Sequence, residues 1–221
     1  MAINVKADIT NYKSMKNIIT NVDYVFHLAA ESRLQPAIEN PIRAVTKNCV
    51  GTTVMLQCAR EAGVKRFIYS STSSGYGNNP FPNVETQPDD CLNPYSASKI
   101  SAEKFCKMYT DLYGLETVIL RYFNVFGQRS PQRGQYAPVI GIFQRQKDAD
   151  EPLTIVGDGS QRRDFVHVED VARANYLASI MPLKKDGIDY TGEVFNVGSG
   201  KCYTVQQIAD AISDNQTYIP E

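Results

Sequence analysis

The sequence predicts an α/β protein whose core is a mostly parallel sheet covered by helices on both faces. Three observations predict it. Apolar segments of strand length alternate with segments of helical spacing, the apolar segments are nearly continuous in branched and aromatic residues, and no internal repeat interrupts the order. Strands that are buried on both faces carry such continuous apolar runs, and helical connections between them favour parallel pairing. We therefore expect a doubly wound sheet.

The first part of the chain carries this alternation most clearly. The predicted elements are a strand over 3–9, a helix over 11–20, a strand over 22–30, a helix over 41–62, a strand over 64–71, a helix over 94–113 and a strand over 116–125. Asn93 is a favourable N-cap and Pro94 a favourable first helical residue, so they predict where the helix over 94–113 begins. Gly114 predicts where it ends.

After about residue 129, connections rich in Gly, Pro and Arg separate shorter elements. We expect a helix near 135–147, a strand over 153–156, a helix over 169–181, a strand over 193–198 and a helix over 204–213. We interpret residues 1–129 as one domain and residues 130–221 as a smaller α/β region, some of whose elements return to the sheet. The smaller region is expected at the carboxyl ends of the strands, where open α/β sheets bind ligands.

Composition excludes several classes of protein. The formal net charge is −1 and the basic residues are scattered, which argues against nucleic acid or an anionic membrane as the main partner. No apolar run approaches the ~18 residues of a membrane span, and the N-terminal residues lack the apolar core of a signal peptide. The five cysteines include no CxxC pair and predict reduced thiols in the cytoplasm. The two histidines, His27 and His167, lie far apart in the chain, which argues against a structural metal site, and both fall at strand positions, which predicts packed side chains.

A glycine-rich turn that would receive the pyrophosphate of a dinucleotide is missing. No GxGxxG follows a predicted strand, and "GDGSQR" (157–162) lacks a third glycine. "GSGKCYT" (198–204) fails as a phosphate-binding loop, because no Ser or Thr follows Lys201 and position 195 is Phe.

The clearest candidate for chemistry is a tyrosine one helical turn before a lysine. Tyr95 falls in the first turn of the helix over 94–113, and Lys99 follows at i+4 on the same face. A helix N-terminus and a nearby cation both stabilise a phenolate. Lowering a phenol pKa of about 10 by about three units needs roughly 4 kcal/mol. From these two residues alone, an ordinary surface Tyr–Lys pair remains an alternative.

A run of hydroxyl side chains follows the strand over 64–71. "YSSTSSGYG" (69–77) lies at the carboxyl end of that strand, the edge at which open α/β sheets place their active sites. A Ser or Thr there is suited to hydrogen-bond the same substrate oxygen that Tyr95 deprotonates. The alternative is a serine-rich loop without a chemical role.

In order along nearly the whole chain, several segments resemble the nucleotide-sugar epimerase/dehydratase group of the extended short-chain dehydrogenases/reductases. They are "ADI" (7–9), "VFHLAA" (25–30), "NCVGT" (48–52), "SSTSSGYG" (70–77), "YSASK" (95–99), "LRYFNVFG" (120–127) and "IVGDGSQRRDFVHVEDVA" (155–172). The resemblance implies a Rossmann-like sheet, with an NAD-binding domain over 1–129 and a nucleotide-sugar-binding region over 130–221. It also implies an incomplete domain that lacks the N-terminal glycine-rich βαβ unit.

The resemblance implies roles for individual residues. Tyr95 would be the general base for a sugar hydroxyl, Lys99 would lower its pKa and hold the nicotinamide ribose, and Thr72 would bond the reacting oxygen. The residues implied for NAD are Asp8, Ile9, Leu28, Ala29, Ala30, Asn48, Ser70, Tyr95, Lys99 and Tyr122. Those implied for the sugar nucleotide are Ser32, Ser73, Asn124 at the diphosphate, Tyr136 and Val139 at the base, and Arg163 at the phosphates.

The implied reaction is NAD-dependent 4-epimerisation of UDP-glucose or UDP-N-acetylglucosamine through a transient 4-keto sugar. Members that dehydrate their sugar place an Asp-Glu pair after the catalytic Thr, whereas this chain has Ser73 and Ser74. "AAESRLQPAIENP" (29–41) also resembles the members that act on UDP-sugars. An NAD(P)-dependent keto-sugar reductase or a dehydratase is the alternative within the group.

Four further expectations follow. The chain is expected to be a fragment truncated at both ends and weak or inactive alone, and a truncated, non-catalytic nucleotide-binding protein stays open as a second alternative. Gly75, where the group usually has Val, is expected to loosen the loop beside Thr72. A homodimer is expected through the helices over 41–62 and 94–113, as in family dimers.

Overall fold

The computed structural model describes residues 2–133 and 137–220. The chain forms two compact units, which are described separately here. Unit 1 comprises Met1–Arg121 and Ala174–Asn196, and unit 2 comprises Tyr122–Arg173 and Val197–Glu221. The assignment of one binding domain to residues 1–129 and another to 130–221 stays a prediction.

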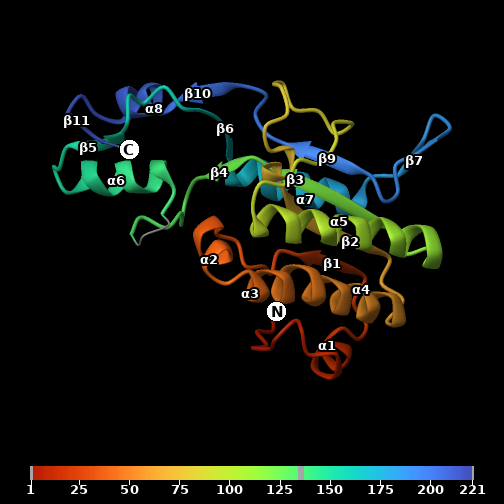
Figure 1. The fold of residues 1–221 in the computed structure, drawn as a ribbon. Coiled ribbons are helices and arrows are strands. Elements are labelled where there is room, and N and C mark those ends of the chain that lie inside the picture. Colours follow the sequence, from red (N-terminus) through yellow and green to blue (C-terminus); the bar gives the residue numbers. More distant parts are fainter. Residues whose placement is uncertain (1, 134–136, 221) are drawn as a thin grey trace. The chain divides into compact units, whose positions relative to one another are not determined.

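A four-stranded sheet with the order β1-β2-β3-β9 organises unit 1 (Figure 1). Its strands are β1 (Tyr24–His27), β2 (Arg66–Thr72), β3 (Thr117–Tyr122) and β9 (Val194–Val197). β1 and β2 are parallel, with Tyr24 opposite Arg66 and His27 opposite Tyr69. β2 is buried along its whole length, as expected of a central strand, and its apolar residues Phe67, Ile68 and Tyr69 are fully buried. The predicted α/β class is confirmed.

The helices around this sheet are α1 (Tyr12–Ile18), α2 (Leu34–Glu39), α3 (Pro41–Val45), α4 (Gly51–Glu61), α5 (Pro94–Tyr113) and α7 (Val168–Ile180). α4 contacts β1 and α5 contacts β2, whereas α1 packs on α4, and α2 and α3 pack on α5. α4 and α5 run side by side (Figure 1) and enclose, with the sheet, a core that includes Leu56, Phe67 and Ile119. The end of α7 is tied to β2, because Arg66 Nη1 donates to the carbonyls of Ala178 and Met181, both at 2.8 Å. β7 (Lys184–Lys185) and β8 (Ile188–Asp189) form a short hairpin.

The predicted helix over 41–62 is present with one irregular turn. Between α3 and α4, residues Thr46–Val50 form a π-helical turn. Such turns occur mostly as single insertions in α-helices, and frequently at functional sites. This one carries Asn48, whose side chain is fully buried.

Unit 2 contains two small sheets. One has the order β10-β6-β4, from β10 (Cys202–Thr204), β6 (Arg162–His167) and β4 (Asn124–Phe126). The other pairs β5 (Leu153–Val156) with β11 (Gln216–Ile219) in parallel. α6 (Val139–Asp148) and α8 (Val205–Ile212) cover β5 around a core of Phe143, Leu153, Ile155 and Ala209. α8 begins with a capping box between Thr204 and Gln207.

The structure corrects several predicted elements. Residues 3–8 form no strand, because the described residues offer them no hydrogen-bonded neighbour and Ile3 is 86% exposed. The strand predicted over 116–125 is divided, since β3 joins the large sheet whereas β4 pairs with β6. β6 and α2 were not predicted, because charged and proline-containing stretches hide them. Among the described residues, no helix is long and apolar enough to cross a membrane.

Candidate active site

In unit 1 the three side chains predicted to be catalytic lie together. Thr72 ends β2, and Tyr95 lies in the first turn of α5, whose N-cap Asn93 accepts a hydrogen bond from Ser96 N at 2.9 Å. Thr72 is close enough to Tyr95 to lower the pKa of its phenol. Lys99 Nζ donates to the carbonyl of Ser70 at 2.5 Å. The sequence thus places a phenol, a hydroxyl and an ammonium at one strand end.

Burial controls the electrostatics of this group. It raises the pKa of Tyr95, while Thr72 and the charge of Arg33 lower it. Burial lowers the pKa of Lys99 to about 8. The role expected of Lys99, to lower the phenol pKa, stays a prediction, and Arg33 contributes a lowering charge that was not expected. The ammonium of Lys99 is directed to the Ser70 carbonyl and lies 4.3 Å from the ring centre of Tyr69.

Sequence reasoning missed Arg33. It caps the N-terminus of α2 and is half-buried. α2 packs against α5, which brings Arg33 towards the first turn of α5. Its only sequence signal was its place in the segment 29–41, which was singled out for its resemblance to UDP-sugar enzymes.

Four of the residues predicted to bind a dinucleotide line one hollow in unit 1. Its volume is about 620 Å³, and it is lined by Lys6, Ala7, Asp8, Ile9, Ala29, Ala30, Glu31, Arg43 and Lys47.

 The predicted residues among the lining are Asp8, Ile9, Ala29 and Ala30. Asp8 is paired with Lys47 at 2.7 Å, and hydrogen bonds from Lys47 and Thr10 lower the pKa of Asp8 to about 2. Ala29 and Ala30 leave the wall open to close approach by a ligand.

Each polar member of "NCVGT" has a structural partner. Asn48 Oδ1 accepts from Glu31 N at 2.7 Å, and its Nδ2 donates to Glu31 O at 3.0 Å and to Ser98 Oγ at 2.9 Å. It therefore fixes the backbone that follows β1 against α5. Gly51 is needed for packing, because a Cβ there would lie 2.6 Å from Ile9 Cδ1. Thr52 Oγ1 donates to Asn48 O at 2.6 Å.

His27 is packed, as the sequence analysis interpreted it. Its ring is buried, its Nε2 lies 3.0 Å from Thr52 Oγ1, and burial lowers its pKa to about 3. The imidazole is therefore neutral near pH 7. Among the described residues no cluster of His, Cys, Asp or Glu is suited to hold a metal ion. The cysteines are free thiols.

The remaining residues predicted for unit 1 are spread over different environments. Ser70 is buried, Ser73 is half-buried in the 3₁₀ turn Ser73–Tyr76, and Leu28 and Ser32 are exposed. The loosening expected at Gly75 is wrong. Gly75 is buried, and a Cβ there would lie 2.3 Å from Ile100 Cδ1, so the glycine lets the turn pack closely against α5.

In unit 2, the predicted substrate residues do not gather at one cavity. Asn124 Nδ2 donates to the carbonyl of Asp164 at 3.0 Å, Arg163 is exposed on β6, and Val139 begins α6. Tyr136 lies outside the described residues, and Tyr122 is half-buried at the end of β3. None of Asn124, Val139 and Arg163 lines the largely apolar cavity of about 870 Å³ found in the described part of unit 2.

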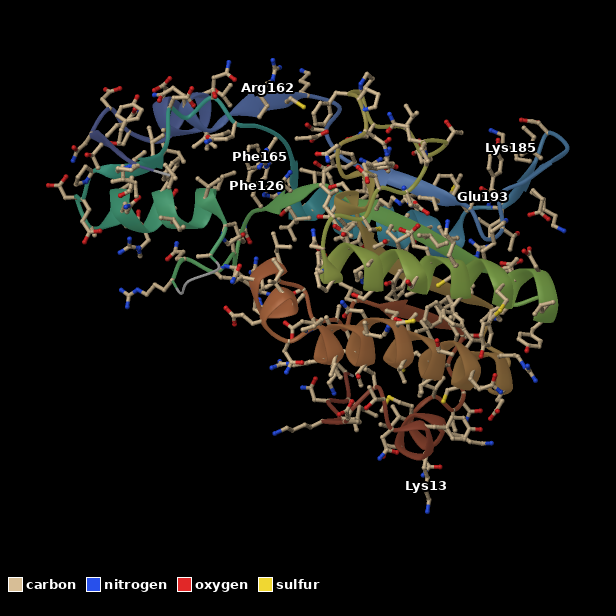
Figure 2. All side chains as sticks on the ribbon, in the orientation of Figure 1. Lys13, Phe126, Arg162, Phe165, Lys185 and Glu193 are labelled. Atoms are coloured by element: carbon tan, nitrogen blue, oxygen red, sulfur yellow. The ribbon has the colours of Figure 1, made fainter. Side chains whose placement is uncertain are left out.

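That cavity has aromatic walls. Phe126 and Phe165 meet edge to face, with ring centres 6.5 Å apart (Figure 2). Ile140 of α6 and Ile208 and Ile212 of α8 add further apolar surface. Sequence reasoning missed these residues as cavity walls, because an aromatic residue in a strand is usually part of a core.

The glycine-containing segment after β9 is held by a carboxylate of the protein itself. Asp164 accepts hydrogen bonds from Ser199 N at 2.8 Å, Ser199 Oγ at 2.7 Å and Gly200 N at 2.9 Å. These amides already bond an anion, which agrees with the sequence argument that "GSGK" is no phosphate-binding loop.

Comparison with known proteins gives consistent matches. The model of the NAD dependent epimerase/dehydratase family matches residues 2–198. A putative UDP-glucose 4-epimerase of Methanocaldococcus jannaschii is 36% identical over 194 residues, which cover 87% of this chain and 60% of that protein. The chain thus spans less than two thirds of that relative's length.

Two solved structures are similar over almost the whole chain. A UDP-N-acetylglucosamine 4-epimerase from Methanobrevibacter ruminantium, solved with UDP-N-acetylmuramic acid, has a TM-score of 0.89 at 34% identity and is matched over 98% of this chain and 69% of its own. The UDP-glucose 4-epimerase of Thermotoga maritima, solved with UDP-glucose, has a TM-score of 0.89 at 35% identity, with 99% of this chain and 72% of its own matched. The predicted Rossmann-like fold is confirmed.

Proposed function

Because the chain belongs to the NAD dependent epimerase/dehydratase family, we propose that it inverts C4 of a UDP-sugar, either UDP-glucose or UDP-N-acetylglucosamine, with NAD⁺ as cofactor. One observation carries the proposal. Thr72, Tyr95 and Lys99 converge at the carboxyl end of β2, where Thr72 is close enough to Tyr95 to lower the pKa of its phenol. The 4-epimerases similar to this chain support the choice of reaction.

The protein's own groups would handle the proton of the reaction. The phenolate of Tyr95 removes the proton from the C4 hydroxyl, and the Thr72 hydroxyl donates a hydrogen bond to the same sugar oxygen. NAD⁺, when bound, supplies the hydride acceptor and donor at C4. After the resulting 4-keto sugar presents its other face, Tyr95 returns the proton to the oxygen and the C4 epimer leaves. Lys99 places a positive charge beside this site.

The residues present fit a dinucleotide. The hollow of about 620 Å³ combines small side chains at Ala29 and Ala30 with hydrogen-bond acceptors and cations at Asp8 and Lys47. Ala29 and Ala30 would admit the cofactor, Asp8 would accept hydrogen bonds from it, and Asn48 would hold the wall in place. In unit 2, Asn124, Val139 and Arg163 would bind the nucleotide part of the substrate, where the guanidinium suits a phosphate.

The carboxylates near the reacting loop favour epimerisation over elimination. The loop Thr72–Tyr76 contains no acid, and the neighbouring acids are already bonded. Glu103 pairs with Arg121 at 2.7 Å, and Asp89 pairs with Lys104 at 2.6 Å. A dehydratase needs an acid that can protonate a leaving hydroxyl, and neither of these is placed in the loop.

Product analysis in D₂O tests the proposal. The protein is incubated with NAD⁺ and UDP-N-acetylglucosamine or UDP-glucose, and the sugar is followed by ¹H NMR. We expect the C4 epimer with hydrogen retained at C4, because the transferred hydrogen is carbon-bound and does not exchange with water. A 4-keto-6-deoxy product would identify a dehydratase. Reduction of a keto sugar with stoichiometric consumption of NADPH would identify the reductase. NAD⁺ binding without any turnover would favour the non-catalytic binding protein.

A homodimer through the helices over 41–62 and 94–113 is part of the same proposal. Light scattering after size exclusion measures the mass in solution, and a mass near that of one chain would contradict the dimer. The cytoplasmic location stays a prediction.

A further inference from the structure

A buried ion pair that the proposed chemistry does not use lies beneath the reacting loop. Glu103 of α5 and Arg121 of β3 have side chains that are each 3% exposed. Arg121 Nε donates to Glu103 Oε1 at 3.0 Å, and its Nη2 donates to Oε2 at 2.7 Å. Two parallel charge-assisted hydrogen bonds fix distance and orientation together.

The ion pair contacts the loop on both sides of Thr72. Before it, the hydroxyl of Ser71 donates a short hydrogen bond to Glu103 Oε1. After it, the guanidinium of Arg121 lies 4.7 Å from the ring centre of Tyr76. The segment from Ser71 to Tyr76, which contains Thr72 and the 3₁₀ turn, is therefore held at both of its ends.

The helical spacing extends this support to the phenol. Tyr95, Lys99 and Glu103 are spaced at i, i+4 and i+8, so they share one face of α5. Tyr95 lies beside Thr72, and Lys99 donates to the Ser70 carbonyl. Glu103 accepts from the Ser71 hydroxyl, so the three contacts fall on residues 70–72 at the end of β2. One face of α5 thus contacts the end of β2 through three residues, and the ion pair with Arg121 fixes the position of the third, Glu103.

Stability alone does not explain why this ion pair is buried here. Well-packed apolar residues often replace a buried ion pair without loss of stability, whereas the pair's fixed geometry has no apolar equivalent. We propose that Glu103 and Arg121 form a positioning unit that holds the Thr72 hydroxyl in register with the Tyr95 phenol. Its effect on turnover rests on the proposed function, whereas its effect on the loop does not.

The test replaces the whole pair, because one partner alone would leave a buried charge. The variant is Glu103→Leu/Arg121→Met, with Glu103→Gln/Arg121→Gln as a second variant should the first not fold. Asp89, which also pairs with Arg121 at 2.7 Å, keeps Lys104 as its partner in both variants. The control is Arg66→Met/Glu116→Leu at the opposite end of β2, which removes another ion pair, 2.9 Å long, together with the hydrogen bonds of Arg66 to Ala178 and Met181.

Hydrogen exchange measured by mass spectrometry reports on the loop without any turnover. We expect the amides of residues 70–77 to exchange at least about tenfold faster in the folded variant, and to be unchanged in the control. Unchanged exchange over 70–77 in a folded variant overturns the proposal. If the wild type binds NAD⁺ and UDP-sugar but turns nothing over, the proposed function fails and this result still decides the positioning role.

Kinetics supply the second readout where the wild type is active. We expect kcat to fall about 100-fold with KM and NAD⁺ affinity unchanged, since a displacement of about 1 Å in a reacting group costs that much. Adding Thr72→Val to the variant should cost little more, because both changes remove the same contact. If the pair had only a structural role, KM and NAD⁺ affinity would change together with kcat. The loss in kcat from the pair variant and the loss from Thr72→Val would then multiply.

Discussion

The burial of Lys99 predicts an unusual dependence of stability on pH. Its side chain is 3% exposed and its pKa is lowered from 10.5 to about 8. Below about pH 8 the lysine is protonated in both the folded and the unfolded state, so folding bears the full cost of burying the charge. Between about pH 8 and 10.5 the unfolded state holds a proton that the folded state has released. Lys99 therefore makes the free energy of unfolding rise with pH in this window.

The magnitude follows from the shift. A difference of about 2.5 pKa units corresponds to roughly 3 kcal/mol at 1.36 kcal/mol per unit. Most of this, roughly 2 to 3 kcal/mol, is recovered between about pH 7 and pH 10, because the folded pKa lies near the lower end of the interval. Lys99→Met keeps most of the side-chain volume and removes the titrating group.

Urea unfolding at about pH 7 and pH 10 measures the effect for the wild type and for Lys99→Met. The wild type should gain roughly 2 to 3 kcal/mol more than the variant over this interval. Lys107→Met, on the same helix with a half-exposed side chain, is the control and should keep the wild-type profile. If the free energy of unfolding depended on pH equally in the wild type and in Lys99→Met, the lowered pKa of the buried Lys99 ammonium would be refuted.

Three further outcomes are expected. Asn48→Ala should lower the free energy of unfolding by roughly 2 to 4 kcal/mol in urea titrations, because it leaves buried hydrogen-bonding partners unpaired, and a loss below about 1 kcal/mol would contradict those bonds. Gly75→Ala should cost roughly 1 to 3 kcal/mol by the same assay and be partly rescued by Ile100→Val, and no rescue would contradict the clash. The lowered pKa of His27 means that stability is lost as pH falls from 6.5 towards about 3. His27→Gln should therefore remove roughly 2 to 3 kcal/mol of the loss between about pH 7 and pH 4.5, and an unchanged loss would contradict a neutral, buried imidazole.

Local signals in the sequence predicted much of the fold. The cap at Asn93 and the glycine at 114 placed α5 at its observed bounds, because capping preferences depend on only a few neighbouring residues. The β-branched and aromatic residues over 64–71 predicted β2. The strand predicted over 3–9 is absent from the described residues. A strand needs a hydrogen-bonded neighbour, which the alternation of side chains does not specify.

The candidate site was predictable only in part. Thr72 and Tyr95 were placed together from their positions at a strand end and in a helical first turn. Arg33, which lowers the phenol pKa, and Arg121, which pairs with Glu103, come from other elements whose approach is set by tertiary packing. The fit of Gly75 against Ile100 likewise depends on how closely a turn approaches a helix, so the sequence alone suggested a looser loop.

The most direct test of the central claim compares the wild type with Tyr95→Phe at saturating NAD⁺, with binding of the cofactor verified by calorimetry. The rate of C4 epimer formation from the UDP-sugar is measured for both, and Tyr113→Phe serves as a control on the same helix. We predict that all three proteins bind NAD⁺ and that Tyr95→Phe alone loses about 10²- to 10⁴-fold in kcat. Epimer formation by Tyr95→Phe at the wild-type rate would contradict the assignment of Tyr95 as the base.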